Sequence, residues 1–146
     1  MHVRGQIRER LGVLLGSIDG LLDHVTFDLP GTVDETVLPW AYVWLGNETI
    51  QPITTGGKQA RQVELFIDLL ARDRSEITGR VEDIAARIEL ALAADKSLGG
   101  LVTDQVLNGY TLDRSDTSAG QASILRVRME YGLTYLTNAG NASVAV

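Results

Sequence analysis

The chain has 146 residues, no cysteine, and 13 lysines and arginines against 19 aspartates and glutamates, which gives a formal net charge of −6. This length fits one domain, residues 1–146, long enough to bury about two-thirds of the surface that its unfolded form exposes. Without cysteine there are no disulfides, thiolate metal sites or cysteine nucleophiles, and so acidic a chain argues against a general surface for nucleic-acid phosphates. A charged start and the lack of any apolar run of about eighteen residues favour a soluble chain, neither exported nor bound to a membrane.

The first elements in the chain are a helix and two strands. Apolar residues recur at steps of three and four over residues 3–22, with Leu14 among them, which predicts an amphipathic helix. Residues 24–29 predict a short strand that ends at Pro30-Gly31, and Leu38–Leu45 predicts the next strand. One face of that strand carries the aromatic side chains of Trp40, Tyr42 and Trp44. Without basic residues between the rings, this stripe indicates core or interface more than a stacking platform for bases.

A polar stretch follows, Gly46–Ala60, which contains Pro52 and Gly56-Gly57 and therefore predicts a long loop of the kind that is usually functional. Gly57-Lys58 within it does not form a phosphate-binding loop. Pro52 stands where that motif needs its first glycine, and Gln59 stands where it needs a serine or threonine.

The second half of the chain predicts a strand, a helix and two more strands. Arg61–Leu70 alternates as a strand does. Asp73 and Glu76 resemble a capping box at the start of a helix that ends before Gly99-Gly100. The apolar stripe of this helix consists of Ile77, Val81, Ile84, Ile88 and Leu92. Leu101–Leu112 then predicts a strand interrupted near Asn108-Gly109, and Asp113–Gly120 a polar turn.

The segment Ala122–Thr137 alternates between apolar and polar residues almost without fault, as a strand with one buried face does. It is about twice as long as a usual strand and longer than a small domain can cover with its own helices, so part of it should contact another chain. The remaining residues, 138–146, are rich in Gly, Asn and Ala and predict a flexible tail.

Together these elements predict an α+β fold: a two-layer sandwich with a mixed, mainly antiparallel sheet and two amphipathic helices packed on one face. If the long strand lies beside Arg61–Leu70, then Arg126 and Arg128 can pair with Glu64 and Asp68 across the open face. The alternative is that these are ordinary exposed charges whose pairing contributes little.

No motif for catalysis, a metal or a cofactor stands out. His2 and His24 lack the spacing of metal ligands, and Glu64 and Asp68 would lie about 13 Å apart, too far for paired catalytic acids. Neither a nucleophile elbow nor a dinucleotide fingerprint is present. We therefore expect an assembly component and not an enzyme, with no metal and no cofactor.

Several segments, in their order and spacing, resemble one family over nearly the whole chain. They are an N-terminal V-R-x-x-I-R helix, Leu38–Trp44, Arg61–Ile67, Ile88–Leu92, Asp95, Leu98–Val102 and Tyr131–Thr137. The chain thus resembles the tail terminator, or minor tail protein U type, of long-tailed bacteriophages. The resemblance implies a virion protein at the head-proximal end of the tail, assembled in the host cytoplasm.

Such proteins form a ring, usually a homo-hexamer, that caps the tail tube, ends its polymerisation and offers a surface for joining the head. The resemblance therefore implies contacts with copies of itself, with the major tail tube protein and with the head–tail connector or neck protein. DNA would pass through the acidic ring without specific binding. The candidate subunit or partner contacts are Thr54, Thr55, Lys58, Glu64, Asp68, Arg126, Arg128 and Glu130.

Two alternatives stay open. A related neck or tail-completion protein, without a terminator role, could use the same α+β plan. A small-molecule-binding regulatory domain could use Trp40, Tyr42 and Trp44 in a pocket, although no polar groups converge near them in the sequence.

Overall fold

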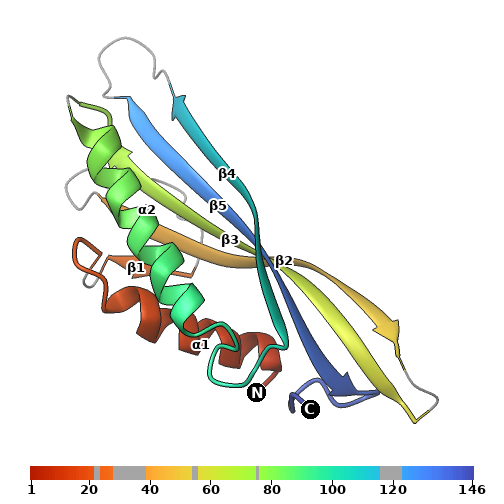
Figure 1. The fold of residues 1–146 in the computed structure, drawn as a ribbon. Helices are drawn as coiled ribbons and strands as arrows, with labels where there is room; N and C mark the ends of the chain where they lie inside the picture. The colour runs from red at the N-terminus through yellow and green to blue at the C-terminus, as the bar shows by residue number, and fades with distance from the viewer. Residues whose placement is uncertain (22–23, 28–38, 54–55, 75, 116–122) are drawn as a thin grey trace.

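The computed structural model describes residues 1–21, 24–27, 39–53, 56–74, 76–115 and 123–146 (Figure 1). Two helices, α1 (Val3–Gly16) and α2 (Ile77–Ala94), lie on one face of a single sheet. Its strands are β1 (Val25–Thr26), β2 (Trp40–Pro52), β3 (Lys58–Arg72), β4 (Asp104–Ser115) and β5 (Ile124–Asn138). They are ordered β1-β2-β3-β5-β4, with β1 parallel to β2 and the other neighbours antiparallel. The predicted α+β fold with a mixed, mainly antiparallel sheet is confirmed.

Strand β5 has the predicted period of two along its whole length. Its side chains alternate between buried and half-buried from Ile124 to Thr137. It pairs with β3 from Ile124 to Asn138 and with β4 from Ile124 to Thr134, so it runs between two strands and both of its edges are occupied. The burial of one face explains why the alternation is so regular, because each inward position must be apolar to enter the core.

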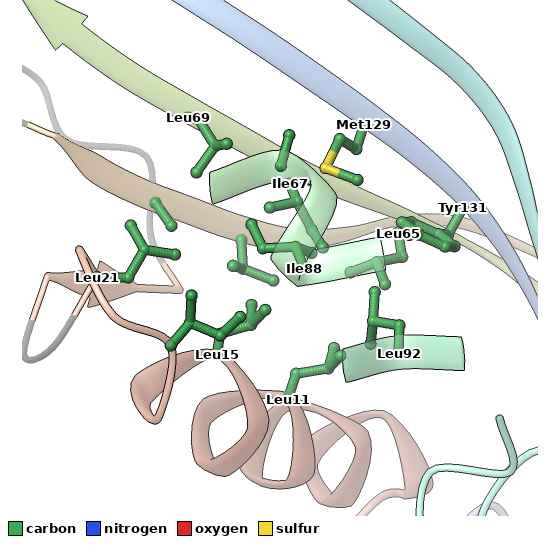
Figure 2. Close-up of a cluster of buried hydrophobic side chains, with 14 of the residues drawn as sticks. Leu11, Leu15, Leu21, Leu65, Ile67, Leu69, Ile88, Leu92, Met129 and Tyr131 are labelled. Carbon is green, nitrogen blue, oxygen red and sulfur yellow. The ribbon is translucent and has the colours of Figure 1, made fainter. Parts of the chain in front are cut away.

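The hydrophobic core fills the space between the helices and the sheet. Figure 2 shows side chains from α1, α2, β3 and β5 meeting there. The fully buried members of this group include Leu11, Leu15, Leu65, Ile67, Leu69, Ile88 and Met129. Each such side chain contributes about 1.5–3 kcal/mol by leaving water, so this layer is the main source of stability. The predicted stripe of α2, Ile77 to Leu92, is buried as expected.

Both helices begin or end differently from the sequence prediction. Helix α1 stops at Gly16 and not at residue 22, because Gly16, Ser17 and Gly20 are poor helix formers. The apolar period nevertheless persists beyond it, since turns carry Ile18 and Leu21 into the core. Leu15, and not Leu14, continues the buried stripe. Of the other early elements, β1 is limited to Val25–Thr26, and Pro30-Gly31 and Leu38 lie outside the described residues.

The predicted capping box is wrong. Glu76 precedes α2 in a left-handed conformation, with φ 68°, and its side chain makes no capping hydrogen bond. Asp73 serves the sheet instead, because its N–H donates to the carbonyl of Ser123 and its carboxylate accepts from Arg114 at 3.2 Å.

The predicted loop Gly46–Ala60 is also wrong. Strand β2 continues to Pro52 and β3 begins at Lys58, so the two form a hairpin that closes with a hydrogen bond from Ile53 N–H to the Lys58 carbonyl. The sequence is polar here because these parts of the strands extend past the helices (Figure 1), and no apolar face is required. Similarly, the first residues of the predicted turn Asp113–Gly120 belong to β4, and residues 116–120 lie outside the described part.

The interruption predicted near Asn108-Gly109 is confirmed as a shift of register between Leu107 and Gly109 on β4. A second shift lies between Leu45 and Glu48 on β2. These two shifts lie on β2 and β4, the strands that flank β3 and β5, while the pairing of β3 with β5 continues without a shift.

The C-terminal segment 138–146 folds back toward α1 (Figure 1). The N–H of Val3 donates to the carbonyl of Ala142 at 2.8 Å, and the Gln6 amide donates to the carbonyl of Ser143 at 2.8 Å. Val146 N–H donates to the Leu136 carbonyl. These bonds place the segment against the helix, and the flexibility expected for it stays a prediction.

Candidate assembly surface

The face of the sheet opposite the helices, called the open face below, contains the predicted pair of Asp68 and Arg128. Arg128 Nε lies 2.8 Å from Asp68 Oδ1 and Nη2 lies 3.0 Å from Oδ2, a bidentate pair between β3 and β5. Asp68 is only 3% exposed, so the expectation that it is a surface charge is wrong. The hydrogen bonds to the Asp68 carboxylate raise the pKa of Arg128, so the Arg128 guanidinium stays charged.

Aromatic rings cover the other side of this guanidinium. Arg128 lies 5.1 Å from the centre of the Trp44 ring and 5.6 Å from that of Phe66, and the two rings stack at 5.0 Å. A cation over such faces gains about 0.5–1 kcal/mol at an exposed site. The cluster of Trp44, Phe66, Asp68 and Arg128 is thus already complete within one subunit.

The remaining predicted charges do not form the expected ladder. Arg126 pairs with Asp113 on β4 at 3.2 Å and not with Glu64, because the register places Arg126 opposite Leu70. Glu64 lies opposite Gly132 and accepts a hydrogen bond from the N–H of Asn47 at 3.3 Å. The exposed Arg126 pair contributes little to the monomer.

The other candidate contacts lie on the same face or at the hairpin. Glu130 is opposite both Phe66 and Gly109. Lys58 is exposed at the start of β3. Thr54 and Thr55 lie outside the described residues.

Between these charges and the hairpin the open face is hollow. A depression of about 400 Å³ has Gly132 in its lining, where β5 has no side chain to fill it. The rest of the lining is mostly polar and consists of Asn47, Thr49, Gln62, Val63, Glu64, Asp104, Val106, Asn108, Leu133 and Thr134. Sequence reasoning missed this depression, although a glycine within a strand is a known signal for close approach, and the Asn108 amide lies where a side chain at Gly132 would begin.

The hairpin and the end of β5 extend beyond both helices (Figure 1). We call this extension, residues 48–52, 58–62 and 134–138, the arm, and the part of the sheet under the helices the body. Exposed apolar side chains lie on the hairpin, with Ile50 47% and Ile53 49% exposed.

A buried polar network holds the base of the arm. Arg61 donates to Glu48 at 3.0 Å and to Thr137 at 2.9 Å, and the Tyr135 hydroxyl donates to Glu48. Burial, followed by the hydrogen bond to Glu48, raises the pKa of Tyr135, so its hydroxyl keeps its proton. Arg4 of α1 reaches the same place, with Nη2 3.0 Å from the Gly46 carbonyl. The network thus joins the three strands of the arm to one another, and Arg4 of α1, 3.9 Å from the Glu48 carboxylate, links it to the body.

The histidines and the aromatic stripe have structural partners. His2 accepts a hydrogen bond from Arg4 N–H at the start of α1, and His24 stacks on Trp40 at 5.0 Å. Trp40 also stacks on Tyr42, and none of the three stripe residues lines the depression of the open face. Over the described ranges there is no group of His, Asp and Glu that could hold a metal, and no helix long and apolar enough to cross a membrane.

No protein-family model and no curated protein matches the chain. Among solved structures, it is similar to a chain of a "Virion of native gene transfer agent (GTA) particle", at 17% sequence identity. The match covers 91% of this chain and 90% of that chain, with a TM-score of 0.32. A likeness at this score carries no argument about function, so the proposal below rests on the surface and on the sequence resemblance.

Proposed function

We propose that this chain is a structural, non-enzymatic virion protein that forms a ring, by resemblance a hexamer, at the head-proximal end of a bacteriophage tail. The ring would cap the tail tube, end its polymerisation and offer a surface to the head connector. The observation that supports this proposal is the arm, which extends beyond both helices and whose strands are joined by Arg61 and Glu48.

The arm has no evident use in an isolated subunit. Its hairpin carries two exposed apolar side chains, Ile50 and Ile53, which no part of the described chain covers. Ordering the hairpin costs conformational entropy, and burying its exposed side chains against another chain would offset that cost. A head-to-tail contact of this kind forms a ring when its rotation closes and a filament when it does not.

The charge of the chain suits a ring through which DNA passes. A net charge of −6 disfavours general adhesion to phosphates, so a channel built from such subunits would let DNA move without binding it. The same property is expected of a neck protein, which therefore remains the second candidate.

Two observations on infected cells test the proposal. Virions carrying a labelled copy of this chain should show the label at the head-proximal end of the tail in negative-stain images, and a label on the capsid or at the tail tip would overturn it. Cells that lack the chain should accumulate over-long tubes if it ends polymerisation. Tubes of normal length that fail to join heads would instead indicate the neck or tail-completion role.

A further inference from the structure

Strand β4 has an uncovered groove on the helix side of the sheet. Helix α2 packs over β3 and β5, which leaves β4 beyond its edge. The hollow between them measures about 360 Å³ and is lined by Glu82, Ala85, Ala86, Glu89, Leu107 and Tyr110. We call this hollow the edge groove. Tyr110 is 43% exposed in it, and Leu90 on the adjoining surface of α2 is 73% exposed.

Strand β4 and the arm part of β2 have matching open edges. Within the described residues β4 pairs only with β5, and β2 pairs with β1 only at Ala41 and Tyr42. The arm part of β2, Glu48–Pro52, therefore has unpaired backbone groups along its outer side. Open strand edges of this kind readily add a strand from another chain.

The strand directions suit such an addition between copies. Each of the steps from β2 to β3, β5 and β4 is antiparallel, so β4 runs opposite to β2. If β2 of a second copy lies beside β4, the antiparallel order continues from one sheet into the next. The side chains also match. Ile50 pairs with Arg61, and Arg61 with the buried Tyr135, so Ile50 faces the helix side and would meet the edge groove.

We propose that the arm edge of β2 in one copy of this chain adds to β4 of the next copy and seats Ile50 in the edge groove, beside Leu107 and Tyr110. The contact joins two different surfaces, so it propagates head to tail. This inference rests on the proposed function, because the contact would be the interface between neighbouring subunits of the ring. We favour a second copy over a foreign partner because this chain carries both surfaces of the contact, the arm edge of β2 and the edge groove beside β4. A foreign strand would use only one of these two surfaces.

Disulfide trapping tests this contact, because the natural chain has no cysteine. In the double variant Ile50→Cys with Tyr110→Cys, a bond within one chain is excluded, since β3 and β5 separate the positions by three strand spacings of about 4.8 Å and a disulfide needs Cα atoms within about 7 Å. Mild oxidation of the concentrated full chain should give a ladder of cross-linked species on a non-reducing gel.

Two matched controls separate a specific contact from collision. Ile50→Cys with Val13→Cys places the second thiol on α1, where Val13 is 67% exposed and lies outside the edge groove. Adding the exposed Ala86→Arg to the first pair blocks the groove without touching the core. Both controls should lose the ladder while keeping the melting temperature of their parent.

The outcomes distinguish this contact from the ring itself. A ladder equal in all variants, or none in either concentrated protein or assembled particles, overturns the inference. Closed rings in negative stain without a ladder would overturn it too, yet leave the proposed function standing with another interface. A ladder on the gel together with open filaments in negative stain, and no closed rings, would support the contact and overturn the ring.

Discussion

The body and the arm are built from the same three strands, β2, β3 and β5, but they are stabilised by different interactions. In the body, one face of each strand lies under the helices and is apolar, as at Leu65 and Val127. In the arm no helix covers the strands, and a buried network around Arg61 replaces the core. Alternation of apolar and polar residues therefore reveals a strand where one of its faces is buried, as on β5 from Ile124 to Thr137, and not in the hairpin part of β2, where most side chains are exposed.

The largest expected effect comes from placing a charge in the body. Ile84→Asp should prevent folding, because Ile84 is 3% exposed and a carboxylate there would have no partner. Loss of the cooperative thermal transition, followed by circular dichroism, measures this. Leu90→Asp, on the exposed face of the same helix, is the control and should melt like the natural chain. Equal melting of both variants would contradict a core at α2.

On the open face, Arg128 and Arg126 should behave differently. Arg128→Gln leaves the buried carboxylate of Asp68 without its cation and should cost about 3 kcal/mol, at the lower end for a broken buried pair because Arg128 is part exposed. Arg126→Gln should cost less than about 0.5 kcal/mol. Urea unfolding of both variants provides the comparison, and similar midpoints would contradict a stabilising buried pair between Asp68 and Arg128.

In the arm, Glu48→Gln should loosen the extension and leave the body intact. The substitution takes the charge partner from Arg61, and hydrogen bonds to charged groups are worth about 1.5–3 kcal/mol. Hydrogen exchange should become faster in residues 48–52 and 58–62 and stay unchanged in α2. Glu64→Gln, an exposed carboxylate on the open face, is the matched control. Faster exchange across the whole chain would mean that arm and body unfold together.

The smallest effect concerns the contact between the helices at low pH. The N–H of Gly99, and then Arg10, hold the pKa of Asp95 below its usual range. A carboxyl with a lowered pKa stabilises the fold above its unfolded value, about 3.9, and this stability is lost as the pH falls through the folded pKa. Asp95→Asn should therefore cost less than about 1 kcal/mol at pH 6, and the melting curves of variant and natural chain should converge toward pH 3. Asp83→Asn, at an exposed position of α2, is the control for the loss of one carboxylate.

The sequence predicted the elements of the body because their periods follow from burial. The stripe of α2 and the alternation of β5 both needed only local spacing. The pairing of Asp68 with Arg128 was also predictable, since both residues point away from the apolar faces of neighbouring strands. Arg126 was assigned the wrong partner because strand register depends on pairings distant in the sequence.

The arm was missed for the opposite reason. Without a covered face, Gly46–Ala60 shows no period that separates a strand from a loop. One signal was present, because Arg61 falls on the inward side of the alternation that runs through Val63 and Leu65. An inward arginine requires a buried partner, but only the fold shows that this partner is Glu48. The capping box failed since Asp73 was already engaged by Arg114.

The unbroken ladder between β3 and β5 has a mechanical consequence. It runs from Lys58 opposite Asn138 to Arg72 opposite Ile124, from the arm to the far end of the body, while both register shifts lie on the flanking strands β2 and β4. When β3 is pulled at the arm while β5 is held at the body, or the reverse, the hydrogen bonds between them are loaded in shear, because they lie across the pulling direction. They must then break together and not one after another, so tension at the arm reaches the helices without a weak point on this path.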